Sequence, residues 1–192
     1  MPLTPSRVIW LREMELHEIT LPDTKPETEW VRGRPLRKMS PLRDHARLQL
    51  VLAAALDAWA RGRGEVGTEW RFRITPPGQV TRPLVPDIAY VSAARLRGLT
   101  GRDLQLPRLA PDVVVEILCA ADERIDIDHK VTIYLHAGSS LVVLVDALQK
   151  AVELHDPYTA ERRTEPEAIE HPALPGFSYS IAKLFSVLEP PR

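Results

Sequence analysis

The sequence predicts an α/β protein in which helices flank a mixed central β-sheet. Two almost continuously apolar runs, Val113–Leu118 (VVVEIL) and Leu141–Val145 (LVVLV), are typical of strands that are buried on both faces. Between them, Asp126–His136 has apolar residues along one side, as an amphipathic helix does. A strand, a helix and a second strand in this order form a βαβ unit, which favours such a sheet.

Turn residues and apolar spacing mark the elements before this unit. We expect short strands at Glu29–Val31 and Pro35–Met39, joined by a turn at Arg32-Gly33. The clearest helix runs from Leu42 to about Arg61, because its apolar residues recur at helical spacing and glycines follow it. Alternating polarity predicts a strand at Val66–Ile74, and a turn at Pro76-Pro77-Gly78 follows it.

The remaining elements follow from the same signals. Leu84–Val91 reads as an extended run, and Ser92 caps a short helix that is followed by a loop rich in Arg, Gly and Pro. After the βαβ unit we expect Ala151–Leu154 to pair beside the second apolar strand, and Ile181–Leu188 to form a final helix. With 192 residues and no internal repeat, the chain fits one domain, residues 1–192.

Composition excludes several classes of protein. Hydrophobic residues make up 44% and charged residues 27% of the chain, as in a globular protein, and the net charge of -1 provides no global basic field for nucleic acid. The one cysteine, Cys119, cannot form an internal disulfide, which indicates a reducing compartment. The first eighteen residues lack the apolar stretch of a signal peptide, and no apolar run approaches the ~20 residues that span a bilayer. We therefore expect a cytoplasmic protein without a membrane partner.

Glu116 is the most unusual residue, because it lies within an apolar strand. A carboxylate in a core is costly unless it is paired, protonated or bound to a metal, and such groups cluster at functional sites. The alternative is a glutamate that turns to solvent or is satisfied by an arginine. Asp87 follows Pro86 at a strand start or bulge, where it is either a site residue or an ordinary turn residue. Asp112 lies four residues before Glu116 and competes with Asp87 for a metal-ligand role, although it also suits simple capping.

Lys130 shares one helix face with Asp126 and Tyr134. It either forms an exposed ion pair or leans toward Glu116, where it could orient a water or stabilise charge on phosphate. Gly-rich phosphate loops, GxSxG and zinc-spaced Cys/His clusters are absent from the sequence. His45 is either near the site or a solvated helix residue. The basic stretch that includes Arg32, Arg34 and Arg43 suits phosphate contacts or a solvated helix start.

Several motifs in order resemble those of the Uma2 family, in the PD-(D/E)XK superfamily of restriction-endonuclease-like proteins. They are EWVRGRP, SPLRDH, VPDIAYVSAARL, LAPDVVVEIL, D-x3-K-x3-Y and AGSSLVVLVD. The resemblance runs from about Glu29 to Leu188 and is most specific from Pro86 to Asp146. It therefore implies a nuclease-like core at about residues 29–188, with residues 1–28 as an N-terminal extension.

The resemblance implies a Mg²⁺-dependent endonuclease, a hydrolase that cleaves DNA phosphodiester bonds. By position, Asp87 is the aspartate of the PD motif, Glu116 is the acid of the following strand, and Glu29 is an early glutamate that completes the acidic site. The superfamily's lysine usually lies two residues after the acid, where this chain has Leu118, and Lys130 stands at the helix lysine of Uma2 proteins. Oxygen ligands from Asp87 and Glu116 suit Mg²⁺ or Mn²⁺.

The chain departs from the family pattern at a few positions. Arg32 and Arg34 stand where acidic residues are usual, and Cys119 stands where serine is usual. These changes alter the charge around Glu29 and leave the other three site residues in place. Two other functions stay open: a nuclease-like binding module with weak or no catalysis, and a structural α/β protein. By analogy with nucleases of this fold, we expect a homodimer.

Overall fold

A six-stranded mixed sheet forms the centre of the computed structural model, which describes residues 18–190. Its strand order is β10-β9-β8-β7-β6-β3. The bounds are β3 Gly64–Thr68, β6 Ile88–Ser92, β7 Val113–Leu118, β8 Leu141–Asp146, β9 Ala151–His155 and β10 Ala160–Arg163. β7 and β8 run parallel and the other neighbours run antiparallel. The predicted mixed sheet with flanking helices is thus confirmed.

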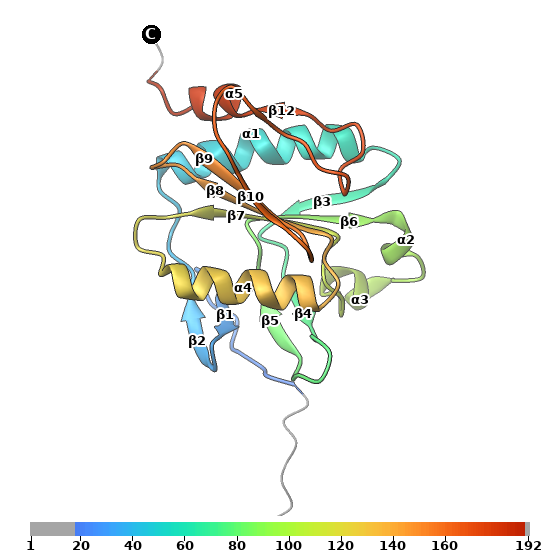
Figure 1. Cartoon of the computed structure of the whole chain (residues 1–192). Helices are drawn as coiled ribbons and strands as arrows, with labels where there is room; N and C mark the ends of the chain where they lie inside the picture. The colour runs from blue at the N-terminus through green and yellow to red at the C-terminus, as the bar shows by residue number, and fades with distance from the viewer. Residues whose placement is uncertain (1–17, 191–192) are drawn as a thin grey trace, which may run out of the picture.

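Helices cover both faces of this sheet (Figure 1). α1 (Arg43–Ala60) and α5 (Ile181–Ser186) lie over one face, and α4 (Arg124–His136) lies over the other and connects the parallel strands. Alternate residues of a strand point to opposite faces. Val113 and Val115 of β7 therefore pack in the core under α1, whereas Val114 packs in the core under α4. Each helix buries one apolar surface, and two cores result.

Three two-stranded sheets flank the central one. β1 (Thr28–Val31) and β2 (Arg34–Arg37) form a hairpin on the α4 side, and β1 contacts both α4 and β5. β4 (Phe72–Ile74) pairs with β5 (Arg82–Leu84), and β11 (Ala168–Ile169) pairs with β12 (Tyr179–Ser180). The short helices α2 (Ala93–Leu96) and α3 (Gly101–Gln105) follow β6. None of the helices within residues 18–190 has the length and apolar character needed to cross a membrane.

Two predicted strands are wrong as single elements. Val66–Ile74 divides into β3 and β4, which belong to different sheets, because Glu69 takes a left-handed conformation (φ 51°) that breaks the extended run. Leu84–Val91 likewise divides into β5 and β6 around Pro86, which lacks a backbone donor for a sheet. Alternating polarity cannot distinguish one long strand from two short ones that change sheets.

The other expected elements appear with small differences in their ends. α1, α4, β7 and β8 lie within two residues of their predicted bounds, and Ser92 caps α2 as predicted. The final helix ends earlier, at Ser186, and the loop after α2 contains the unpredicted α3. Residues 1–17, which hold most of the expected N-terminal extension and of the segment judged not to be a signal peptide, lie outside the described residues.

Candidate active site

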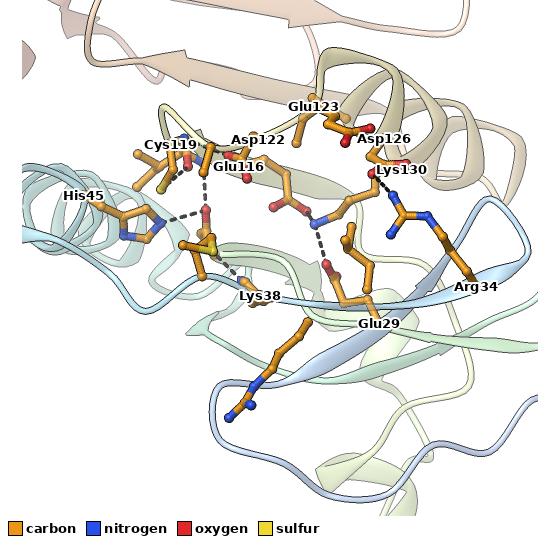
Figure 2. A pocket seen from close by; sticks show the side chains of 17 residues that line it. Glu29, Arg34, Lys38, His45, Glu116, Cys119, Asp122, Glu123, Asp126 and Lys130 are labelled. Carbon is orange, nitrogen blue, oxygen red and sulfur yellow. Dashed lines mark hydrogen bonds and ion pairs between the residues drawn. The ribbon is translucent and has the colours of Figure 1, made fainter.

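The four predicted catalytic residues meet at one pocket of about 190 Å³ between the β1–β2 hairpin, the central sheet and the first half of α4 (Figure 2). Glu29 comes from β1, Asp87 from the residue before β6, Glu116 from β7 and Lys130 from α4. All four are buried, with at most 4% of their surface exposed. Groups that are 101 residues apart in the sequence thus form one charged cluster.

The alternation of β7 directs Glu116 toward α4. Glu116 lies two residues after Val114, so it shares the face that packs against this helix. Its Oε1 accepts a hydrogen bond from the Tyr134 hydroxyl at 3.2 Å and lies 2.7 Å from the Lys130 ammonium. Its Oε2 accepts no hydrogen bond from residues 18–190, and Glu116 borders the pocket. The second carboxylate oxygen is therefore a free acceptor.

Burial and neighbouring charge shift the acidity of Glu116. Burial raises the pKa of this carboxyl to about 7, and the negative charges of Asp87 and Glu29 act in the same direction, while Lys130 opposes them. The partners of Glu116 are thus a lysine and a tyrosine, whereas the alternative interpretation of the sequence had this glutamate turn to solvent or pair with an arginine. Near neutral pH this carboxyl is poised between its charged and neutral forms.

Lys130 forms the centre of a buried triad. Its ammonium donates to Glu29 Oε2 at 2.8 Å and lies 2.7 Å from Glu116 Oε1 (Figure 2). Burial disfavours its charge, but the two carboxylates outweigh that effect and raise the pKa of Lys130. The lysine therefore stays protonated, and the reading of Lys130 as an exposed helix ion pair is wrong, because only 3% of its surface is exposed. One of its three N–H donors remains for another acceptor.

Glu29 links the hairpin to the site. Its Oε1 accepts the backbone N–H of Val85 at 2.7 Å, while Oε2 binds Lys130. The first bond holds the segment between β5 and β6 against β1, directly before Asp87. Glu29 thus positions both the lysine of α4 and the loop that carries the aspartate.

Asp87 lies on the same side of the sheet as Glu116. β6 pairs with β7 such that Ile88 lies opposite Val115, so one further step of this antiparallel register places Asp87 opposite Glu116. Asp87 Oδ2 accepts the Ile117 backbone N–H at 2.7 Å and lies 3.1 Å from His45 Nε2. Burial tends to raise the pKa of Asp87, but the charge of Lys38 and the His45 bond hold it well below its usual value. Asp87 is therefore an anion.

Two basic residues from the segment around the start of α1 hold Asp87. The Lys38 ammonium donates to Asp87 Oδ1 at 2.6 Å, and His45 lies on the first turn of α1. Asp87 raises the pKa of His45 against the effect of burial. The His45 Nδ1 atom is buried and finds no partner within the described residues. His45 is thus a largely buried neighbour of the site rather than a solvated helix residue.

The other predicted residues are distributed around or away from the pocket. Arg34 lines it and lies 2.5 Å from Asp126, which Arg32 also contacts at 3.3 Å. Arg43 donates instead to Asp44 and to the Leu188 carbonyl. Asp112 lies outside the site: at the other end of β7 its carboxylate accepts the Ser92 backbone N–H and pairs with Arg95.

Sequence reasoning did not assign Lys38 or Tyr134 to the site. Tyr134 shares the helix face of Lys130, and that spacing was the signal that could have placed it beside Glu116. Lys38 belongs to the basic stretch before α1, but nothing in its local sequence distinguishes it from the neighbouring arginines. Its role depends on a contact with a residue 49 positions away.

The donor chemistry fits a hard divalent cation, because the pocket offers carboxylate oxygens from Asp87 and Glu116, and Mg²⁺ needs only one or two carboxylates beside its waters. Within residues 18–190, no group of three or more Asp, Glu, His or Cys side chains is arranged to hold a metal. The Lys38 ammonium donates to Asp87 Oδ1, so this oxygen atom can bind a metal only when Lys38 moves away.

Comparison with a solved structure agrees with this fold. The chain resembles the crystal structure of "a putative nuclease belonging to DUF820" from Anabaena variabilis ATCC 29413, with a TM-score of 0.78 and 23% sequence identity. The match covers 88% of this chain and 95% of that chain. At this identity the likeness shows the fold alone. No curated protein matches the sequence.

The sequence itself matches a known family over most of its length. Residues 14–182 match Uma2, a family described as "Putative restriction endonuclease". This range includes every residue of the pocket and the whole central sheet. The chain therefore belongs to the Uma2 family.

Proposed function

We propose that this protein is a Mg²⁺-dependent endonuclease that hydrolyses DNA phosphodiester bonds, with Asp87 and Glu116 as metal ligands. One observation carries the proposal: a buried glutamate with a free oxygen borders a pocket, beside an aspartate on the next strand and a protonated lysine. Family membership supports nucleic acid as the substrate. A bound Mg²⁺ or Mn²⁺ supplies positive charge that stabilises the negative charge on phosphate during hydrolysis.

Lys130 assists the attacking water in this proposal. Its ammonium is fixed by Glu29 and Glu116, so the remaining N–H has a defined direction. A donor that is held in place before the reaction stabilises developing charge without a reorganisation cost. Glu29 acts through Lys130, because its carboxylate keeps the ammonium charged and beside Glu116.

Basic residues at the pocket provide contacts for the DNA backbone. Arg34 lines the pocket with 45% of its side chain exposed, so its guanidinium is accessible to phosphate. Arg32 and Arg43 are exposed further out, with 39% and 53% of their side chains accessible. We propose that Arg32 and Arg43 also contact DNA phosphates, and that His45 lies at the inner edge of the surface that these three arginines form.

By analogy with nucleases of this fold, which often act as dimers because two DNA strands need two sites, we also propose a homodimer of the single nuclease-like domain. Analytical ultracentrifugation with and without duplex DNA measures this state. A monomer under all conditions that still cuts both strands would refute the dimer and leave the site assignment intact.

Metal titration tests the ligand assignment. We expect Mg²⁺ or Mn²⁺ to raise the melting temperature, because a ligand that binds only the folded state stabilises it. Glu116→Gln keeps the size of the side chain and should abolish the shift. Asp112→Asn is the matched control, since Asp112 lies at the opposite end of β7 from the pocket, where it accepts the Ser92 backbone N–H, and its replacement should leave the shift unchanged. An unchanged shift in Glu116→Gln would rule out this ligand.

A nicking assay on supercoiled DNA tests the activity. The wild-type protein should convert supercoiled to open circular DNA only with metal, and Glu116→Gln and Lys130→Ala should lose this activity while circular dichroism confirms that they fold. EDTA should stop the wild-type reaction.

A nuclease-like binding module is the second candidate, because Lys38 and His45 already engage Asp87. Clear metal binding without cleavage of single-stranded, duplex or branched DNA would favour this function over hydrolysis. Cleavage that depends on metal and on Glu116 would exclude it.

A further inference from the structure

The Lys38 side chain reaches into the site from the connection between β2 and α1. Its ammonium contacts Asp87 Oδ1 at 2.6 Å, the Val85 carbonyl at 2.8 Å and the Glu69 carboxylate at 3.1 Å. Only 13% of this side chain is exposed. A lysine side chain is a cation at neutral pH, and the surrounding oxygen atoms of Asp87, Val85 and Glu69 favour this charged form. A positive charge therefore lies 2.6 Å from a carboxylate oxygen of Asp87, a proposed metal ligand.

Asp87 has no unoccupied side toward a metal in this arrangement. Oδ2 is held by the Ile117 backbone N–H and by His45, and Oδ1 is held by Lys38. The Ile117 amide belongs to β7 and cannot leave without disrupting the sheet. The flexible lysine side chain is the partner that can move away from the pocket.

We propose that Lys38 is a tethered cation that competes with divalent metal for Asp87 and so sets the metal concentration at which the site loads. The inference rests on the proposed function, because it assumes that Asp87 is a ligand. Two like charges cannot share one carboxylate oxygen at close range without strong repulsion. Metal binding at Asp87 and the Lys38–Asp87 ion pair therefore exclude each other.

Glu69 provides the position to which Lys38 moves. The Glu69 side chain is 43% exposed, and its carboxylate already contacts Lys38 and accepts a hydrogen bond from Gln49 Nε2 at 3.2 Å. Gln49 also donates to the Asp87 backbone carbonyl at 2.8 Å, which keeps Glu69 beside the site. A lysine that leaves Asp87 can thus keep one carboxylate partner at the surface, which lowers the free energy of displacement.

Removal of the Lys38 charge should strengthen metal binding. We expect Lys38→Met, and independently Lys38→Gln, to lower the apparent dissociation constant for Mn²⁺ by about tenfold or more, because an adjacent like charge is removed. The free Mn²⁺ signal in electron paramagnetic resonance measures binding without any activity. Lys25→Met is the control: it removes the same charge from a side chain that is 91% exposed and should leave binding unchanged.

A change at Glu69 separates displacement from simple electrostatics. Glu69→Gln removes the alternative partner of Lys38 and should weaken Mn²⁺ binding in the wild-type background. In the Lys38→Met background the same change should have little effect, because no lysine has to be displaced. If Glu69 attracted the metal directly, Glu69→Gln would weaken Mn²⁺ binding equally in both backgrounds, and displacement of Lys38 toward Glu69 would be overturned.

The outcomes separate this inference from the proposed function. Tighter Mn²⁺ binding by both Lys38 variants than by the wild-type protein supports competition between Lys38 and the metal for Asp87. The same conclusion holds if the variants bind Mn²⁺ measurably and the wild-type protein binds it too weakly to measure. Equal binding by the wild-type protein and both variants overturns the role of Lys38 and leaves the metal-dependent nuclease intact. If neither the wild-type protein nor any folded variant binds Mn²⁺, the metal site fails and the inference fails with it.

Discussion

Replacement of Lys130 by methionine tests the buried triad most directly. The change keeps the length of the side chain but removes the cation between Glu29 and Glu116, whose carboxylates lie 2.8 Å and 2.7 Å from it. Loss of one partner from a buried ion pair costs about 3–5 kcal/mol, because an uncompensated charge remains in the interior. For a chain of this size each kcal/mol lowers the melting temperature by about 2–4 °C, so we expect a fall of about 6–20 °C.

Urea unfolding and thermal melts in EDTA measure this change. Lys25→Met is the control, because its exposed ammonium contacts only Glu27 among the described residues, and its loss should leave stability unchanged. The double variant Lys130→Met/Glu116→Gln should recover part of the loss, since one orphaned carboxylate is then neutral. A Lys130→Met protein as stable as the Lys25→Met protein would refute the buried triad.

Three further predictions follow from the pKa values and contacts. Folding raises the pKa of Glu116 from 4.5 to about 7, so between these pH values the folded protein binds one proton more than the unfolded chain. The stability of the wild-type protein relative to Glu116→Gln should therefore fall as pH rises between about 4.5 and 7, by up to about 3 kcal/mol. Urea unfolding of both proteins at pH 5 and pH 8 measures this difference. A difference that stays constant between pH 5 and pH 8 would show that the carboxyl is ionised throughout and would refute the raised pKa. Tyr134→Phe should cost about 1–3 kcal/mol, as the loss of one buried hydrogen bond to Glu116 does, and an unchanged midpoint would contradict that bond. Cys119, whose pKa burial raises to about 11, should react with iodoacetamide at pH 7 about a hundredfold more slowly than free cysteine, and a rate like that of the free thiol would show an exposed side chain.

Much of the fold could be predicted because its signals are local. The apolar runs of β7 and β8 and the helical spacing of α1 and α4 reflect burial on both faces or on one side of each element. Where two strands in different sheets share one alternating run, as at Val66–Ile74, the sequence offers no sign of the break. Glu69 in its left-handed conformation causes that break, and a glutamate in the sequence does not indicate such a conformation.

Some residues of the candidate site could likewise be recognised from the sequence, whereas others are brought together only by the fold. Glu116 could be recognised without any structure, because a carboxylate inside VVVEIL requires a partner. Asp87, Lys130 and Glu29 joined it through resemblance to Uma2, and their meeting at one pocket is a property of the fold. Asp112 competed with Asp87 for a metal-ligand role in the sequence, although it also suited simple capping; it lies at the far end of β7 from the pocket, where its carboxylate accepts the Ser92 backbone N–H.

The sequence alone therefore determined the βαβ unit, the mixed sheet and the one carboxylate that needs compensation. These follow from periodicity and from the cost of burying charge, which act within a single element. Only the tertiary structure decided which groups compensate that carboxylate and that Lys38 lies on Asp87. Such contacts join residues far apart in the chain, and they depend on strand register, loop paths and helix packing together, which no local pattern encodes.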